Sequence, residues 1–472
     1  MVPSSLKAPA ESPVAPLDLK TKLAYGTGEV GKEIVGSILV FFVLFFLTNV
    51  AGLSPSLAGA VLMLGRVWDA INDPLVGWLS DRTRSRWGRR FPWMMTGAVP
   101  LGVCFCLQWW VPPTSQTWTL FAYYSVVVFF LYASLTAVSI PHSTLAAELT
   151  QGYDERTTLA SFKASFSIGS SILGLVLAQF IFAAIADTRQ QYLALGAVGG
   201  AIAILTTFLC VWGTYKRYWD MQAVRPQLEL VTPIPMWQQV RIAFSNRPFL
   251  YVMGVYLCSW MGLQITAAIL PYFVVDWMGL SDDAFTQTAI AVQGSALIAM
   301  FFWNALGQRV GKRAIYCMGI PLTLVSILGL FLLQPGQVGL MYGLAIATGI
   351  GLATAYLVPW SMLPDAIDLD ELNTGQRREG IFCGFLIQLQ KFGTAIAIFL
   401  VGNALEWAGL VTGLEGQSRT VQPELALQTI RWLIGPLPAF LLAIGIVLAA
   451  LYPISRSFHE EIVLKLKERS GK

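Results

Sequence analysis

One stretch of the chain, residues 66–74, places an arginine and two carboxylates within an otherwise apolar segment. On a helix, Asp69 and Asp73 lie one turn apart on the same face, and Asn72 lies beside both. Arg66 precedes Asp69 by one turn and shares that face. Carboxylate and amide oxygens are hard ligands, which suit Na⁺ or H⁺ better than a soft transition metal. The spacing therefore predicts a monovalent-cation site, and a structural ion-pair network between helices is the alternative.

The element that must position these side chains is a helix that crosses a bilayer. The apolar segment around them, residues 57–79, is long enough, because about 20 residues span the hydrocarbon core. A charge at the centre of a bilayer costs about 2.5–3.5 kcal/mol on the insertion scale, so several charges in one segment indicate a functional role. The chain has 472 residues, of which 55% are hydrophobic and 12% charged, with a mean hydropathy of +0.61. This composition predicts an integral membrane protein.

Apolar runs of spanning length recur about twelve times, which predicts an all-α protein with about twelve transmembrane helices. The longest polar stretch, residues 215–247, divides the runs six and six. We therefore expect two six-helix bundles, at residues 21–214 and 248–454, joined by that stretch as a cytoplasmic linker. Flexible cytoplasmic tails are expected at residues 1–20 and 455–472.

The two predicted bundles carry corresponding motifs at similar distances along the chain, which favours an internal duplication. A glycine followed by two basic residues comes after the second apolar run and again after the eighth. A proline followed by a carboxylate comes late in the fourth run and again late in the tenth. The matching sets are Gly88 to Arg90 with Gly311 to Arg313, and Pro141 and Glu148 with Pro359 and Asp365.

Positive charge is concentrated in alternate connections between the apolar runs, which predicts the orientation in the membrane. The connections at residues 51–56 and 111–117 contain no lysine or arginine, and Arg189 and Arg419 are minor exceptions. We therefore expect a multi-pass protein of the cell (inner or plasma) membrane with both termini in the cytoplasm. The connection after the second run holds Arg82, Arg84, Arg86, Arg89 and Arg90.

Other function classes find little support in the sequence. The net charge of +4 is small for this length and the basic residues lie in the loops, which disfavours a nucleic-acid partner. The six cysteines show no zinc or redox spacing, so we expect reduced packing residues. We find no nucleophile with a base and no phosphate loop, so we expect neither an enzyme nor a cofactor. His142 is expected to be a packing residue, with a proton relay as the alternative. The expected partners are the bilayer, a small solute and a monovalent cation, bound by a monomer.

The segment from Gly77 to Arg82, continuing to Gly88 and Arg90, resembles the signature after the second helix of major facilitator superfamily transporters. Together with residues 66–74, it resembles the glycoside-pentoside-hexuronide:cation symporters, the melibiose-permease-like family. The resemblance implies the major facilitator fold, with two pseudo-symmetric six-helix bundles. It also implies symport of a sugar or glycoside, coupled to Na⁺, Li⁺ or H⁺, by alternating access. The likeness recurs at residues 25–33, 140–156 and 357–391.

The same resemblance implies roles for individual positions. The cation site of the family corresponds to Asp69, Asn72, Asp73 and Thr136. Its sugar-binding aspartate and tryptophan on helix four are serines here, and a serine offers a neutral group where a carboxylate accepts charge-assisted hydrogen bonds. Recognition of a galactoside of the melibiose type is therefore less expected. The candidate substrate residues are Lys32, Glu33, Arg66, Ser139, Ser143, Lys163, Tyr356 and Lys391. Lys391 lies too deep within its apolar run to reach the interface, so it is also interpreted as a neighbour of the ion site.

Charged residues at the cytoplasmic ends of the runs are interpreted as gating ion pairs, with solvated loop charge as the alternative. A lysophospholipid or another amphiphile is the rival substrate, and it would require a laterally open cavity lined by residues such as Phe41 and Phe42. A membrane sensor that binds without transport is a further alternative. Trp68 and Trp360 are candidate substrate contacts. The gating candidates are Asp81, Arg82, Arg156, Asp365, Asp368 and Arg377.

Overall fold

The computed structural model describes residues 16–150, 153–224, 236–374, 379–411, 422–454 and 456–470. Within these ranges the chain forms helices and no strand. The helices are α1 (Leu19–Phe45), α2 (Pro55–Arg82), α3 (Phe91–Gln108), α4 (Thr117–Leu149), α5 (Tyr153–Ala184), α6 (Thr188–Val224), α7 (Met236–Ser245), α8 (Arg247–Tyr272), α9 (Asp282–Val310), α10 (Lys312–Leu332), α11 (Val338–Thr374), α12 (Glu379–Trp407), α13 (Glu424–Ile434), α14 (Pro436–Ala450) and α15 (Arg456–Ser470).

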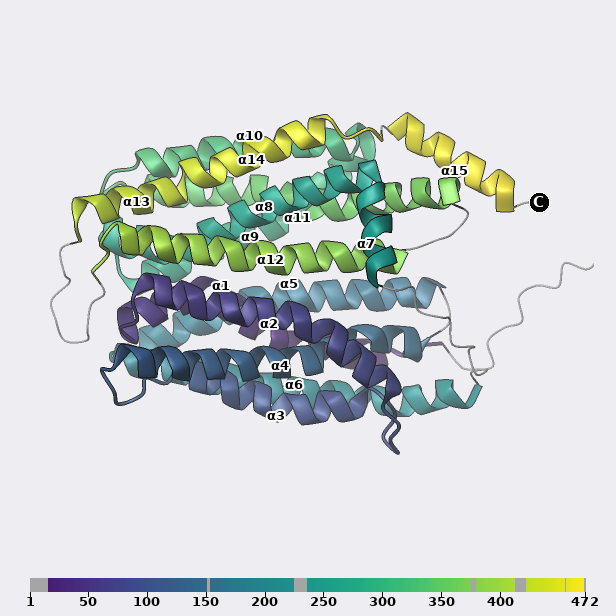
Figure 1. The fold of residues 1–472 in the computed structure, drawn as a ribbon, viewed down its shortest axis with the longest axis horizontal. Coiled ribbons are helices and arrows are strands. Elements are labelled where there is room, and N and C mark those ends of the chain that lie inside the picture. The colour runs from purple at the N-terminus through teal and green to yellow at the C-terminus, as the bar shows by residue number, and fades with distance from the viewer. Residues whose placement is uncertain are drawn as a thin grey trace, which may run out of the picture.

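The long helices form two bundles that lie side by side, α1 to α6 in one and α8 to α14 in the other (Figure 1). Among the described residues, 11 helical segments are long and apolar enough to cross a membrane, and α13 and α14 together make one of them. The 28-residue helix α2 is also long enough, at 1.5 Å per residue, but carries the charges noted above. The predicted all-α fold with paired bundles is therefore confirmed.

The two bundles share details that an internal duplication explains. Helices α1 and α8, the first in each bundle, both continue into a π-helical turn, η1 (Phe46–Val50) and η2 (Phe273–Trp277). The two matching glycines both adopt a positive φ, +89° at Gly88 and +91° at Gly311. A residue with a Cβ is strained there, so each turn depends on its glycine.

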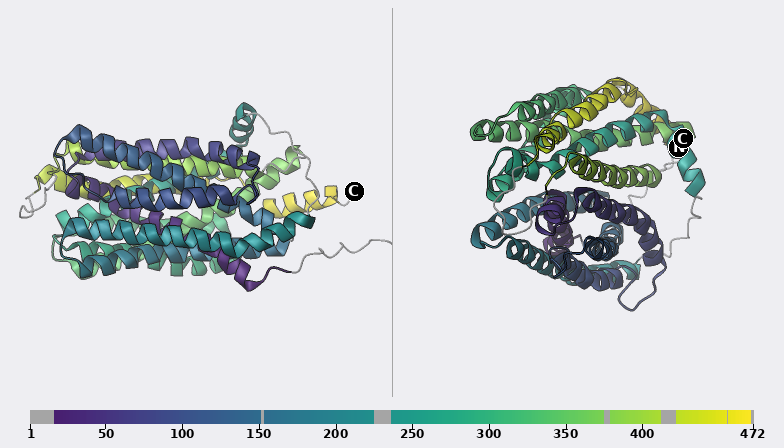
Figure 2. Two further views of the ribbon diagram at one scale, coloured as in Figure 1. Left: turned by 90° about the horizontal axis from the view of Figure 1, so that it is seen from below. Right: turned by 60° about the vertical axis from the view of Figure 1, so that its left-hand side comes forward.

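The predicted division into domains stays a prediction, and its boundaries can be compared with the ends of the helices. Helix α6 continues ten residues into the predicted linker and ends at Val224. Part of that linker, residues 225–235, lies outside the described residues, and α7 follows it. Helix α15 lies in the predicted C-terminal tail, at the end of the molecule where α1 begins (Figure 2).

The bundles are joined at the predicted extracellular end. An apolar cluster there contains buried residues of both bundles, whereas two further clusters each belong to one bundle. Phe42 packs edge-on against Phe285 of the other bundle, with ring centroids 4.9 Å apart. The hydroxyl oxygens of Thr48 and Tyr272 are 2.6 Å apart. The space between the bundles is therefore closed toward this end.

Helices α2 and α12 touch across the bundle interface at this closed end. A Cβ at Gly402 would lie 2.4 Å from the carbonyl oxygen of Pro55 and 3.2 Å from the Cα of Gly59. We therefore expect Gly402→Leu to force the closed end apart. Overpacking of this kind costs about 1–3 kcal/mol, enough to raise the open fraction about tenfold.

A buried cysteine can report on this opening. Ala289 is fully buried in the cluster that joins the bundles. With Ala289→Cys as the reporter, a maleimide that cannot cross membranes should label the protein from outside about tenfold faster when Gly402→Leu is present. The protein without Ala289→Cys controls for the native cysteines. Equal labelling rates with and without Gly402→Leu would show that this contact does not hold the end closed.

Candidate functional site

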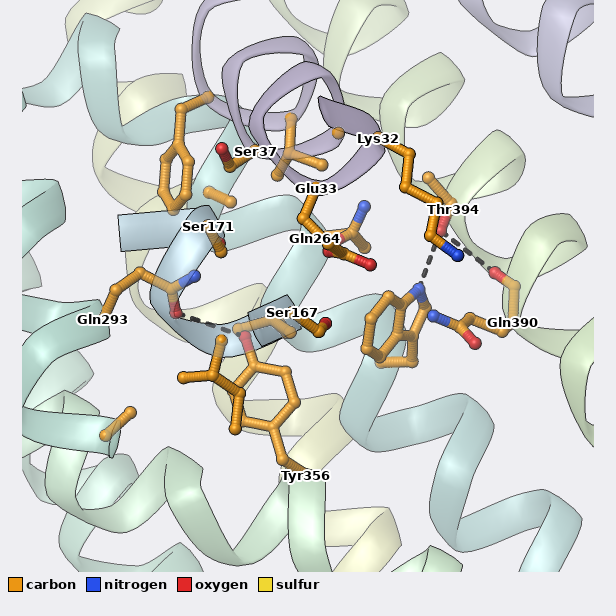
Figure 3. Close-up of a pocket in the computed structure, with 18 of the residues that line it drawn as sticks. Lys32, Glu33, Ser37, Ser167, Ser171, Gln264, Gln293, Tyr356, Gln390 and Thr394 are labelled. Atoms are coloured by element: carbon orange, nitrogen blue, oxygen red, sulfur yellow. Dashed lines mark hydrogen bonds between the residues drawn. The ribbon is translucent and has the colours of Figure 1, made fainter. Parts of the chain in front are cut away.

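A cavity of about 640 Å³ lies between the two bundles. Figure 3 shows polar side chains of both bundles pointing into it, including Lys32 and Glu33 from α1 and Gln293 from α9. The cavity is also lined by residues of α2, α4, α5, α8, α11 and α12. It therefore lies where the two halves of the molecule meet, directly below the closed end, whose cluster supplies Phe41 and Ala267 to the lining.

The predicted cation cluster forms beside this cavity. The Thr136 hydroxyl lies 3.1 Å from Oδ1 of Asp69 and 3.1 Å from Oδ1 of Asp73. The Lys391 ammonium lies 2.9 Å from Oδ2 of Asp69 and 2.5 Å from Oδ2 of Asp73. Both carboxylates are buried, with 4% and 9% of their surface exposed. Three helices, α2, α4 and α12, thus converge on one pair of carboxylates.

Close packing of α2 on α4 positions the carboxylates. Gly65 lies one turn before Asp69, and a Cβ there would lie 2.1 Å from Val128 of α4. Since Gly65 has no side chain, α2 can approach α4 closely enough for Asp69 and Asp73 to reach Thr136. Both residues of the pair face α4 because they are four apart on one helix.

The remaining polar residues of α2 lie around this pair. Asn72 is buried, and its Nδ2 has no hydrogen-bond partner among the described residues. The guanidinium of Arg66 stacks over the Tyr132 ring at 5.0 Å from the centroid, and its Nε is buried without a hydrogen bond in the described part of the chain. Arg66 also lines the cavity. Two buried polar groups with unmet bonding capacity thus lie next to the carboxylates.

The ion pairs of the cluster are shared unevenly. Lys391 is the ion-pair partner of both Asp69 and Asp73, whereas the guanidinium of Arg66 lies nearby without an ion pair to either among the described residues. Buried carboxylates so close together repel each other unless cations lie between them. The lysine therefore occupies the position that a bound monovalent cation would compete for, and the two carboxylates and the Thr136 hydroxyl supply oxygen ligands for such a cation.

Six of the eight predicted substrate residues line the cavity: Lys32, Glu33, Arg66, Ser139, Tyr356 and Lys391. The other two lie apart from the lining described here. Lys163 donates a hydrogen bond to the Ser143 hydroxyl at 3.1 Å, and its ammonium lies 3.7 Å from Glu29. A substrate role for Ser143 and Lys163 stays a prediction.

The cavity also contains a set of neutral hydrogen-bonding residues that were not predicted from the sequence. The Trp260 indole donates to the Thr394 hydroxyl at 2.7 Å, and the Tyr356 hydroxyl lies 3.4 Å from the amide oxygen of Gln293 (Figure 3). Amides and hydroxyls within apolar helices were the available signal, because each must find a partner away from water. The set comprises Ser37, Ser167, Ser171, Gln264, Gln293, Gln390 and Thr394.

Of the four aromatic residues predicted as substrate contacts, two line the cavity and two do not. Phe41 and Trp360 line the cavity. Trp68 instead stacks on Phe129 with centroids 4.2 Å apart, and Phe42 is fully buried in the cluster that closes the extracellular end. Only the first two can contact a solute in this conformation.

The predicted gating residues of the first bundle lie near its predicted cytoplasmic end. Asp81 pairs with Arg90, which also binds Glu148 at 3.0 Å. The guanidinium of Arg82 stacks on Trp78 at 4.1 Å from the ring centroid. The side chain of Arg156 lies outside the described residues.

The predicted gating residues of the second bundle form a matching group. Asp365 accepts a hydrogen bond from Lys312 at 2.6 Å, and Asp368 lies 3.2 Å from His459 of α15. Arg377 lies outside the described residues. These ion pairs join residues of the same half of the chain, as the pair of Arg90 with Glu148 does in the first bundle. A role in gating stays a prediction.

Comparison with known proteins agrees with this architecture. Residues 24–456 match the family described as MFS/sugar transport protein. An uncharacterized symporter of Synechocystis sp. is 42% identical, over 96% of this chain and 97% of that protein. The sodium-dependent lysophosphatidylcholine symporter 1 of Xenopus tropicalis is 26% identical, over 93% and 88%. The crystal structure of the nucleoside transporter NupG has the same fold, with a TM-score of 0.64, 14% identity and coverage of 93% and 100%.

Proposed function

The chain belongs to the MFS/sugar transport protein family and is thus a membrane transporter of the major facilitator type, and we propose that it couples symport of a hydroxyl-rich solute, such as a glycoside, to Na⁺. The observation that carries the proposal is the pairing of a carboxylate cluster with a cavity surrounded by neutral hydrogen-bonding groups. We place the protein in the cell membrane with both termini in the cytoplasm, as the charge of the connections indicates.

The cation site consists of Asp69, Asp73 and Thr136, and the side-chain amide oxygen of Asn72 is a neighbouring ligand. Na⁺ displaces the ammonium of Lys391 from between the carboxylates and takes over part of its charge compensation. Relatives of 24–26% identity include several proteins named as sodium-dependent symporters, which favours Na⁺ over Li⁺ or H⁺. Resemblance of residues 66–74 to the glycoside-pentoside-hexuronide:cation symporters supports the same site.

Thr136 provides a test of the cation site that preserves its shape. Thr136→Val removes the hydroxyl that both carboxylates share and keeps the volume, so we expect Na⁺ affinity to fall about tenfold. Thr136→Ser retains the hydroxyl and should stay close to the wild type. The measurement is the Na⁺ concentration that gives half-maximal thermal stabilisation of the purified protein. Equal Na⁺ affinity in the valine and serine variants would remove Thr136 from the site.

The solute site follows from the cavity lining. Amides and hydroxyls come from both bundles, for example Ser171 on α5, Gln264 on α8 and Thr394 on α12. Such groups can exchange hydrogen bonds with several hydroxyls at once. The rings of Trp260 and Trp360 add apolar faces of the kind that pyranose rings pack against. A glycoside fits this mixture of neutral polar groups and aromatic faces.

A lysolipid is the second candidate, and a separate observation favours it. The cavity wall between α5 and α9 carries the apolar side chains Ile168, Ile172, Leu297 and Met300. An acyl chain would bury its surface against such a wall, while a charged head group would face Lys32 and the carboxylates. The relative from Xenopus tropicalis is named as a lysophosphatidylcholine symporter.

Coupling follows from the electrostatics of closing the cavity. The ionised carboxylates of Asp69 and Asp73 are costly in a closed, poorly hydrated space unless cations pair with them. Bound Na⁺ and solute therefore favour the closed form more than either does alone, and rocking of the bundles then exposes both ligands on the other side. Without Na⁺, closure around the solute is disfavoured.

A binding screen with the purified protein tests the proposed function. Thermal unfolding is measured with a panel of glycosides and with lysophosphatidylcholine, each in Na⁺ or in choline buffer. A ligand that binds the native state raises the melting temperature. We expect stabilisation by a glycoside that is larger in Na⁺. Stabilisation by lysophosphatidylcholine alone would favour the lipid, and counterflow in vesicles would then separate transport from sensing.

A further inference from the structure

A second group of charged residues lies within the first bundle, outside the cation cluster. Its centre is Glu29, a carboxylate on α1 that is 1% exposed. His142 of α4, which is fully buried, lies on one side of it. Neither residue lines the described cavity, and neither contributes to the proposed Na⁺ site. A buried carboxylate and a buried imidazole in contact need a physical explanation, since each is expensive to remove from water.

The contacts of Glu29 converge on one oxygen atom. Its Oε1 lies 2.8 Å from the Lys32 ammonium, 3.2 Å from Nδ1 of His142 and 3.7 Å from the Lys163 ammonium. The other ring nitrogen of His142, Nε2, lies 2.9 Å from the backbone carbonyl oxygen of Tyr25. The Tyr25 ring stacks on the imidazole at 4.7 Å, which holds the ring plane in place.

These distances place one proton of the imidazole and leave room for another beside Glu29. A carbonyl oxygen can only accept, so Nε2 of His142 carries a hydrogen and donates it to Tyr25. Nδ1 then faces Oε1 of Glu29 at 3.2 Å. If neither atom carried a proton, two lone pairs would oppose each other at hydrogen-bonding distance in a buried site. Neither atom has a hydrogen-bond partner among the described residues, so a proton bound there, on the imidazole or on the carboxyl group, would relieve this repulsion.

We propose that Glu29 and His142 form a proton-binding site, separate from the Na⁺ site, that exchanges its proton when the charge on Lys32 moves. Lys32 connects this site to the cavity, because the same side chain contacts Glu29 and lines the solute space. A solute that draws the ammonium away from Glu29 removes positive charge beside the pair and strengthens proton binding. Solute and proton thereby bind cooperatively, and each affects the other equally.

The surroundings of the pair contain groups of both signs. The ammonium groups favour the form without the proton, and the second carboxylate on α1 favours the form that holds it. The titratable neighbours are Tyr25, Lys32 and Glu33 on α1, Lys163 on α5 and Cys210 on α6. Loss of either ammonium therefore shifts the balance toward the protonated pair.

The chain has only two histidines, which makes the site directly observable. In His459→Gln, ¹⁵N-histidine labelling leaves the two ring nitrogens of His142 as the only imidazole signals. We expect Nε2 to stay protonated while the Nδ1 signal titrates between about pH 5 and 9. Lys32→Met should raise the midpoint of that titration by about one pH unit or more, and Glu29→Gln should lower it by a similar amount.

The opposite signs of the two shifts distinguish a proton site from a structural role. A packing histidine would give signals that do not change with pH, or midpoints that neither substitution moves, and either result overturns the proposal. If Glu29→Gln does not fold, two measurements still test the proposal. They are the titration of Nδ1 in the His459→Gln protein and the shift of its midpoint when Lys32→Met is added. The measurement requires no solute and no Na⁺, so it stands or fails independently of the proposed symport.

Discussion

A protein with cysteine in place of Asp73 is expected to lose its response to Na⁺. Asp73 lies between the Thr136 hydroxyl and the Lys391 ammonium, and removal of one member of a buried charged group costs roughly 2–5 kcal/mol. Na⁺ affinity should therefore fall about 100-fold or more. Uptake into vesicles of the solute that the binding screen identifies should no longer depend on Na⁺. Asp69→Cys should have the same effect.

Two comparisons make this result specific. Glu424→Gln removes an exposed carboxylate at the start of α13 and should leave the Na⁺ response unchanged. The melting temperature in choline buffer shows whether Asp73→Cys still folds. A folded Asp73→Cys protein with wild-type dependence on Na⁺ would disprove the assignment of the cation site.

Replacing Lys391 with methionine is expected to make the protein depend on Na⁺ for its stability. The ammonium forms an ion pair with both Asp69 and Asp73. Without it the two carboxylates repel each other, so we expect a loss of roughly 3 kcal/mol in choline buffer. Na⁺ no longer competes with the lysine and should restore most of that loss. Thermal unfolding with and without Na⁺ measures both effects.

Lys312→Met provides the matched control for this experiment. It removes another lysine that pairs with a carboxylate, Asp365, but at a distance from the cation cluster. Its stability should fall equally in Na⁺ and in choline. If Na⁺ stabilises Lys391→Met no more than the wild type, the lysine and the cation do not share a position.

The sequence was sufficient to predict those parts of the site that violate the rules for a membrane helix. Charges in an apolar run are conspicuous, so Asp69, Asp73 and Lys391 could be identified before any coordinates. Helical spacing placed the two carboxylates on one face, and the resemblance to a known family supplied Thr136. The structure brings all four side chains together.

Other parts of the site depend on contacts between distant segments. Glu29 lies in a membrane helix and was visible in principle, but its partners His142 and Lys163 come from two other helices. Periodicity within one helix cannot show which helices face each other. Gln264 and Thr394 could not be singled out either, because their neutral side chains change the hydropathy of their helices very little.

The paired π turns have a consequence for how the closed end could be released. A π turn holds one residue more than an α turn, so its conversion to α geometry shifts the register of everything beyond it by one residue, about 100° of rotation. Thr48 lies within η1, and Tyr272 directly precedes η2. Such a slip in η1 would turn the Thr48 hydroxyl away from that of Tyr272, so a movement confined to a few residues of α1 would break this contact between the two halves of the molecule.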